Sequence, residues 1–98
     1  MEKVAVIGAG MVGRAWAIVF ARAGRVVSLY DTDAGVLENA LVLIAGAAND
    51  LNREGLVEED AQAILGRITA TTDLAAALKD AGYAQENAPE DLELKRDL

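Results

Sequence analysis

The chain has 98 residues, enough for one compact domain, and its apolar share of 53% and charged share of 26% are ordinary for a globular protein. Its formal net charge of −7 provides no cationic face for nucleic acid or for an anionic membrane surface. Without histidine or cysteine, disulfides and thiolate chemistry are excluded, and only carboxylates are left as metal ligands. These carboxylates lack the spacing of a calcium loop, so we expect no metal site.

The N-terminal half alternates between strand and helix patterns. Residues 3–7 (KVAVI) form an apolar run ended by glycine, which predicts a buried parallel strand. Residues 11–23 predict a helix closed by Gly24, with one face formed by Met11, Ala15, Ile18 and Val19. Residues 25–30 (RVVSLY) predict a second strand. A long helix is expected from residue 33 to about 53, with an apolar stripe of Leu37, Leu41, Ile44, Ala48 and Leu51.

The second half continues the alternation with shorter elements. Residues 58–65 predict a helix with acidic residues in its first turn, and the β-branched residues 68–71 predict a third strand. A helix from residue 73 to about 79, a weakly signalled strand at 83–85 and a last helix at 89–98 follow. We therefore predict an α/β fold with a doubly wound parallel sheet and right-handed crossovers. The chain ends within the last predicted helix, so we expect it to be part of a larger fold.

The apolar N-terminus matches neither a signal peptide nor a membrane span. Glu2 stands where a signal peptide is basic, and Arg14, Arg22 and Arg25 interrupt the apolar run. We therefore expect a cytoplasmic protein.

Residues 8–13 (GAGMVG) match the dinucleotide-binding pattern G-x-G-x-x-G. Gly8 permits a tight strand-to-helix turn, Gly10 lets a pyrophosphate approach the backbone, and Gly13 lets the helix pack closely on the strand. The pyrophosphate is then expected at the N-terminus of the helix, where free N–H groups and the helix dipole attract an anion. The alternative is that these glycines only tighten the turn between strand and helix.

Asp31 ends the second predicted strand, twenty-three residues after Gly8. A carboxylate at this point accepts hydrogen bonds from the adenosine ribose hydroxyls and repels a 2′-phosphate. Since no lysine or arginine follows until Arg53, the sequence favours NAD over NADP. The alternative is that Asp31 only caps the next turn.

Three segments together resemble the L-3-hydroxyacyl-CoA dehydrogenase family: VAVIGAGMVGRAWAIVFARAG (4–24), VVSLYD (26–31) and YAQENAPEDLELKRDL (83–98). The motif GRAWA resembles the branch that contains lambda-crystallin and L-gulonate 3-dehydrogenase. The resemblance implies that residues 1–98 are a partial, Rossmann-type NAD-binding domain. It also implies a helical excursion at about 34–66 and a C-terminal helical domain that is absent here.

The resemblance implies further cofactor contacts. Met11 and Val12 would contribute backbone groups to NAD, and Glu90 and Lys95 match the family's cofactor-binding Glu and Lys. Two alternatives remain open: Glu90 is an acid favoured in a first helical turn, and Lys95 pairs with Asp91. Glu86 ends the fourth strand and is also expected near the cofactor.

Asn87 follows Glu86 and departs from the small or apolar residue expected at this position. This departure puts the packing beside the cofactor site in question.

The catalytic residues are expected beyond residue 98. Family members use a His–Glu pair, in which histidine takes the hydroxyl proton as hydride leaves for the nicotinamide, and this chain has no histidine. The C-terminal domain that closes the cleft and forms the homodimer is also missing. We expect an NAD-dependent dehydrogenase as the parent protein and no activity from this chain alone.

Two substrate classes fit the resemblance: a 3-hydroxyacyl-CoA, which places the protein in fatty acid metabolism, or a small 3-hydroxy acid such as L-gulonate. CoA phosphates require cations, yet residues 34–54 contain only Arg53. This favours the small acid, although the missing region could supply CoA contacts. A non-catalytic NAD-binding, sensing or crystallin-like structural module, or a doubly wound domain that binds no nucleotide, remains an alternative.

Overall fold

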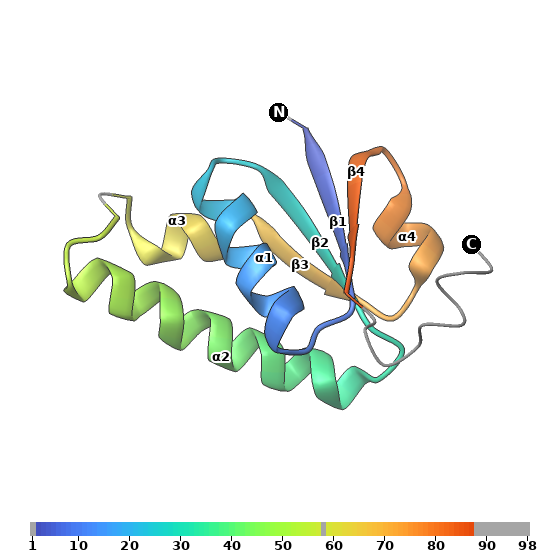
Figure 1. Ribbon diagram of the computed structural model, residues 1–98, viewed down its shortest axis with the longest axis horizontal. Helices are drawn as coiled ribbons and strands as arrows, with labels where there is room; N and C mark the ends of the chain where they lie inside the picture. Colours follow the sequence, from blue (N-terminus) through green and yellow to red (C-terminus); the bar gives the residue numbers. More distant parts are fainter. Residues whose placement is uncertain (1, 58, 88–98) are drawn as a thin grey trace.

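The computed structural model describes residues 2–57 and 59–87. Its centre is a parallel sheet of four strands in the order β3-β2-β1-β4 (Figure 1). The strands are β1 (Lys3–Ile7), β2 (Val26–Tyr30), β3 (Ile68–Thr71) and β4 (Ala81–Glu86). The predicted α/β class and the parallel sheet are therefore confirmed.

The helices are α1 (Met11–Arg22), α2 (Ala34–Arg53), α3 (Ala61–Leu65) and α4 (Leu74–Leu78). Helix α1 packs on β1 and β2, while α4 lies on the other side of the sheet (Figure 1). Helix α2 runs alongside α1 and also contacts α3 and β3. The predicted elements up to residue 87 are present. However, α3 begins three residues later than predicted, so the acidic residues precede it, and β4 is longer than predicted. The helix predicted at 89–98 lies outside the described residues.

The buried face of α1 differs from the prediction. Small residues, not the largest apolar ones, face the sheet: Gly13, Ala17 and Ala21 are buried. Met11 is 75% exposed, Val19 is 48% exposed and Ala15 is exposed as well, so the predicted face was wrong in these three residues. Small side chains allow the helix axis to approach the sheet closely, and this approach determines which residues are buried.

The buried stripe of α2 was largely predicted. Leu37, Ile44 and Ala48 are buried, but Ala40 takes the place of the predicted Leu41, which is 38% exposed. By length and hydropathy, α2 is the one helix of the described residues that could cross a membrane. A core helix of a soluble protein meets the same criterion, so this is weak evidence for a membrane span.

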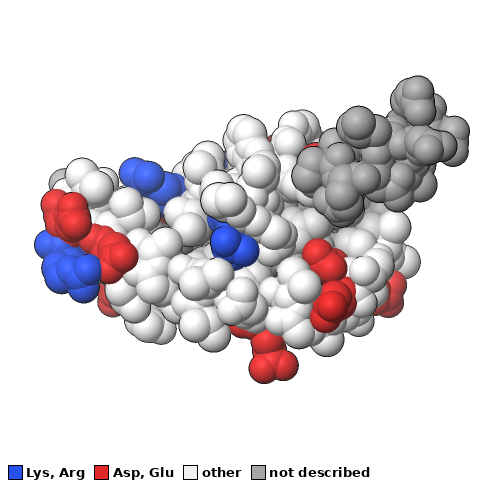
Figure 2. Space-filling view, turned by 60° about the horizontal axis from the view of Figure 1, so that its bottom comes forward, with Lys and Arg blue, Asp and Glu red and all other residues white. Residues whose placement is uncertain are grey.

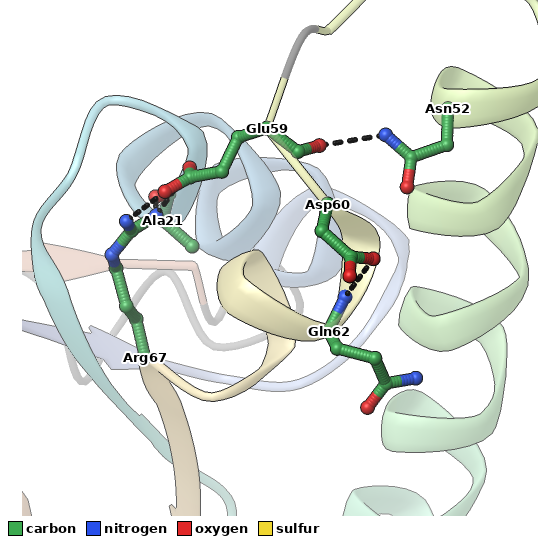
Figure 3. Close-up of polar contacts among 6 residues, drawn as sticks. All are labelled: Ala21, Asn52, Glu59, Asp60, Gln62 and Arg67. Atoms are coloured by element: carbon green, nitrogen blue, oxygen red, sulfur yellow. Dashed lines mark hydrogen bonds and ion pairs between the residues drawn. The ribbon is translucent and has the colours of Figure 1, made fainter.

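A polar network fixes the connection from α2 to β3 (Figure 3). Asn52 of α2 donates from Nδ2 to the Glu59 carbonyl oxygen at 2.7 Å and accepts from the Ala61 N–H at the start of α3. Arg67 donates to both carboxylate oxygens of Glu59 and to the Ala21 carbonyl oxygen of α1. The network therefore joins α1, α2 and α3 beside the sheet.

The hydrogen bond from Arg67 lowers the pKa of the Glu59 carboxyl below its ordinary value, and the charge of Arg67 acts in the same direction, while desolvation opposes both. A lowered pKa in the folded state means that the ion pair stabilises the fold at neutral pH. This contribution is lost as the pH falls through the lowered pKa.

Asn52→Ala removes both hydrogen bonds at the start of α3. We expect the free energy of unfolding to fall by about 1–2 kcal/mol relative to Asn49→Ala, measured by urea denaturation. Asn49 is an exposed residue of the same helix, so its substitution controls for the difference in helix propensity between Asn and Ala. Equal stability of the two variants would show that the Asn52 contacts contribute nothing.

Candidate functional site

The carboxyl ends of the strands lie together at one edge of the sheet. The register pairs Ile7 with Tyr30 of β2 and with Glu86 of β4, and Tyr30 with Thr71 of β3. The strand arrows converge at this edge in Figure 1. In open parallel α/β sheets, ligands bind at this edge where the strand order reverses. That reversal falls here between β1 and β4, because the chain turns toward β2 after β1 and returns to the other side with β4.

The glycine turn begins directly at the end of β1. Gly8 has φ +101°, a conformation that favours glycine, and its N–H donates to the Tyr30 carbonyl oxygen at 2.7 Å. Gly13 lies so close beneath it that a Cβ there would stand 1.8 Å from the Gly8 carbonyl oxygen. The predicted tight turn and close helix packing are therefore both present in the structure.

Gly10 occupies the N-cap position of α1, and apart from its chain neighbours no described residue has an atom within 4 Å of the position that a Cβ would take. The other three described helices are each capped by an aspartate side chain, Asp33, Asp60 or Asp73. Helix α1 has no acidic residue in its first turn, and none of the residues described by the structure caps it with a side chain. Its first N–H groups, those of Met11 and Val12, consequently have no intrahelical partner and no capping side chain from residues 2–57 or 59–87.

Asp31 connects the glycine turn to the start of α2. Its Oδ2 accepts a hydrogen bond from the Ala9 N–H at 3.0 Å, and its Oδ1 accepts one from the Asp33 N–H, also at 3.0 Å. Asp31 thus caps the following turn, as the alternative interpretation required. It also accepts a hydrogen bond from Ala9, which lies in the glycine turn after β1. An ionised carboxylate accepts about four hydrogen bonds, so acceptor capacity remains beyond these two.

The end of β4 lies beside the glycine turn. Glu86 pairs with Ile7 and is half-buried, in agreement with its expected position at the ligand-binding edge. Asn87 packs against the turn itself, because a Cβ on Gly8 would approach the Asn87 carbonyl oxygen to 2.9 Å. Sequence reasoning noted Asn87 only as a departure from the expected residue. Glu90 and Lys95 lie outside the described residues.

The structure therefore brings together most of the predicted site. Gly8, Gly10, Gly13 and Asp31 surround the N-terminus of α1 with Met11 and Val12, whose side chains are 75% and 52% exposed. In the described part of the chain, no group of three or more acidic side chains is placed to hold a metal ion. The geometry suits an anion held by backbone N–H groups.

Comparisons with known proteins agree with this geometry. Residues 3–98 match the family described as "3-hydroxyacyl-CoA dehydrogenase, NAD binding domain". The chain is 39% identical to a lambda-crystallin homolog of Bos taurus over 97 residues, which are 97% of this chain and 30% of that protein. It is also 39% identical to an L-carnitine dehydrogenase of Streptomyces griseus, covering all of this chain and 28% of the relative.

Among solved structures, 3-hydroxybutyryl-CoA dehydrogenase from Escherichia coli superposes with a TM-score of 0.88 at 36% identity, covering 98% of this chain and 20% of that chain. The fold and the glycine turn define a Rossmann-type dinucleotide-binding domain. More particularly, the chain belongs to the family of NAD-binding domains of 3-hydroxyacyl-CoA dehydrogenases. It spans about 30% of the length of the curated relatives that it matches.

Gly10 and Gly13 are expected to differ in how much their substitution by alanine lowers the free energy of unfolding. Gly13→Ala forces its Cβ against the Gly8 backbone, so we expect a loss of about 3 kcal/mol in the free energy of unfolding. Gly10→Ala places its Cβ clear of every described residue except its chain neighbours, so we expect a change within about 1 kcal/mol. Urea denaturation of both variants measures the difference. A Gly13→Ala chain as stable as Gly10→Ala would contradict the close approach of α1 to β1.

Proposed function

We propose that this chain binds NAD with its pyrophosphate over the Gly8–Gly13 turn, as part of an NAD-dependent dehydrogenase that oxidises the C3 alcohol of a 3-hydroxy acid or its CoA ester. The observation that carries this proposal is the N-terminus of α1. Among the described residues, no side chain caps it and no atom beyond the chain neighbours of Gly10 lies within 4 Å of where a Gly10 Cβ would stand, and it lies at the carboxyl edge of the sheet.

Asp31 is the proposed partner of the adenosine ribose. The Ala9 and Asp33 N–H groups hold its carboxylate in place before any ligand arrives, so little side-chain entropy is lost on binding. Its remaining lone pairs accept the ribose hydroxyls, whereas a 2′-phosphate would be repelled. Glu90 and Lys95 are proposed as further cofactor-binding residues on the family resemblance alone.

NAD supplies the hydride acceptor in this class of reaction. The residues of this chain bind the dinucleotide, orient it across the sheet edge and discriminate against NADP. We place no catalytic residue among them, because the chain has no histidine to take the hydroxyl proton. The His–Glu pair implied by the family resemblance would belong to the part of the protein beyond residue 98.

A free 3-hydroxy acid is the favoured substrate. The names of two similar proteins correspond to the two alternatives: an L-carnitine dehydrogenase to a free hydroxy acid, and a 3-hydroxybutyryl-CoA dehydrogenase to a CoA ester. Binding CoA phosphates requires cations, but α2 carries only Arg53, which is already paired with Asp50. The view in Figure 2 likewise shows a largely uncharged face without a broad band of lysine and arginine.

The similarity to lambda-crystallin homologs supports a second candidate, a non-catalytic NAD-binding or structural module. The remaining parts of the proposal are a cytoplasmic location, a homodimeric parent protein and no nucleic-acid or membrane partner. The net charge of −7 supports the exclusion of nucleic acid and anionic membranes. A role in fatty acid metabolism would follow only from the CoA-ester alternative.

Asp31→Asn tests the proposed ribose contact. In asparagine an NH2 group replaces one of the two carboxylate oxygens, so the side chain can no longer accept from both the Ala9 and the Asp33 N–H groups. The negative charge of the acceptor is lost as well. We expect NAD binding to weaken by about 1.5–3 kcal/mol, measured by isothermal titration calorimetry. The preference for NAD over NADP should fall at the same time.

Asp80→Asn is the matched control for this substitution. Asp80 precedes β4 at the opposite edge of the sheet and has φ 61°, which asparagine tolerates. Its NAD affinity should equal that of the unsubstituted chain. If Asp31→Asn also left NAD affinity unchanged, the assignment of the ribose contact would be wrong.

The chain by itself should not reduce NAD. Mixed with NAD and either L-carnitine, L-gulonate or 3-hydroxybutyryl-CoA, it is expected to give no increase in absorbance from NADH, because it lacks the general base. Measurable turnover by the purified chain would contradict the placement of the catalytic residues beyond residue 98.

A further inference from the structure

Asn87 makes an unusual set of contacts at the end of β4. Its backbone N–H donates to the Ile7 carbonyl oxygen at 2.7 Å, which extends the pairing of β4 with β1. Its side-chain Nδ2 donates to the same oxygen at 3.3 Å and to the Gln85 carbonyl oxygen at 3.2 Å. The last carbonyl of β1, immediately before the glycine turn, is therefore held by two donors from one residue.

The same residue also lies near both ends of the glycine turn. A Cβ on Gly8 would stand 2.9 Å from the Asn87 carbonyl oxygen and 3.5 Å from the Asn87 Cβ. A Cβ on Gly13 would stand 3.7 Å from the Asn87 Nδ2. Asn87 is half-buried at this point, with its carbonyl beside Gly8 and its carboxamide on the side of Gly13.

We propose that Asn87 is a positioning residue for the pyrophosphate site: its carboxamide fixes the Ile7 carbonyl and thereby the position of the Gly8–Gly13 turn. This inference rests on the proposed binding of NAD at that turn. The turn offers backbone N–H groups to the anion, and a displacement of about 1 Å is enough to weaken such aligned contacts. Asn87 acts through the turn and requires no contact of its own with the cofactor.

The carboxamide of Asn87 supplies a hydrogen-bond donor that its surroundings require. Two carbonyl oxygens face Nδ2, so the position requires a donor. Alanine leaves both oxygens without the side-chain donor. Aspartate places a negatively charged acceptor against two acceptors and adds an anion beside the pyrophosphate site. We therefore expect binding to decrease in the order Asn87, Asn87→Ala, Asn87→Asp.

The first test needs no ligand. Hydrogen exchange of the Gly8 and Ala9 amides, followed by NMR, should be faster in Asn87→Ala than in the unsubstituted chain because the turn is less restrained. Asn39→Ala, an exposed substitution on α2, is the control and should leave both rates unchanged. If Asn87→Ala does not fold, Asn87→Leu, which keeps the branched shape of the side chain but has no donor, is measured in its place. Unchanged exchange at Gly8 and Ala9 would overturn the inference.

The second test separates positioning from a general structural role. Asn87→Ala should lower the affinity for NADH and for ADP-ribose by about fivefold to tenfold, since both ligands carry the pyrophosphate. Adenosine, which lacks it, should bind with unchanged affinity to the Asp31 side of the site. Equal losses for adenosine and NADH would indicate a general loss of structure and contradict the inference.

The outcomes for the two proposals are distinct. If the unsubstituted chain does not bind NADH, the proposed function fails, whatever the exchange rates at Gly8 show. If it binds NADH and Asn87→Ala binds equally well, only the role of Asn87 is refuted. A salt titration adds a further criterion. The affinity for NADH that Asn87→Asp loses relative to Asn87→Ala should become smaller as salt screens the aspartate charge.

Discussion

The close approach of α1 to β1 is the constraint on which this structure depends. Gly13 and the Gly8 carbonyl oxygen leave no room for even one methyl group between helix and strand. The same close packing continues along the helix, where Ala17 and Ala21 are fully buried. Because α1 lies so near the sheet, its N-terminus is held directly at the edge where the strands end. The ligand site is therefore a consequence of how the helix packs.

Two side chains then determine the shape of that site. Asp31 links the loop after β2 to the Ala9 amide, and Asn87 links the end of β4 to the Ile7 carbonyl. The glycine turn lies between them and is held from both neighbouring strands. Gly10 occupies the capping position of α1 and has no side chain to cap it, and we propose that an anion of the cofactor binds there. Of the four described helices, α1 alone follows a glycine turn and lacks a side-chain cap from the described residues.

The sequence predicted the fold class, the glycine turn and the place of Asp31, because each depends on a local pattern. Apolar runs ended by glycine or aspartate were enough to locate β1 and β2. The packing of α1 was not predictable in this way, since the stripe of large apolar residues suggested Met11 and Val19, while helix–sheet distance selected small ones. The contact of Asn87 with Ile7 joins residues far apart in sequence, so no local pattern indicated it. The extent of β4 was also underestimated, because its pairing with β1, rather than its composition, defines it.

The most direct test of the account is an NMR titration of the chain with NAD, monitored at the backbone amides. We predict that the largest chemical-shift changes occur at Gly10, Met11 and Val12, with smaller ones at the Ala9 amide, which is bonded to Asp31. Saturable changes at these amides would support binding of the pyrophosphate at the N-terminus of α1. Saturable changes confined to other parts of the chain, or no change at saturating NAD, would contradict it.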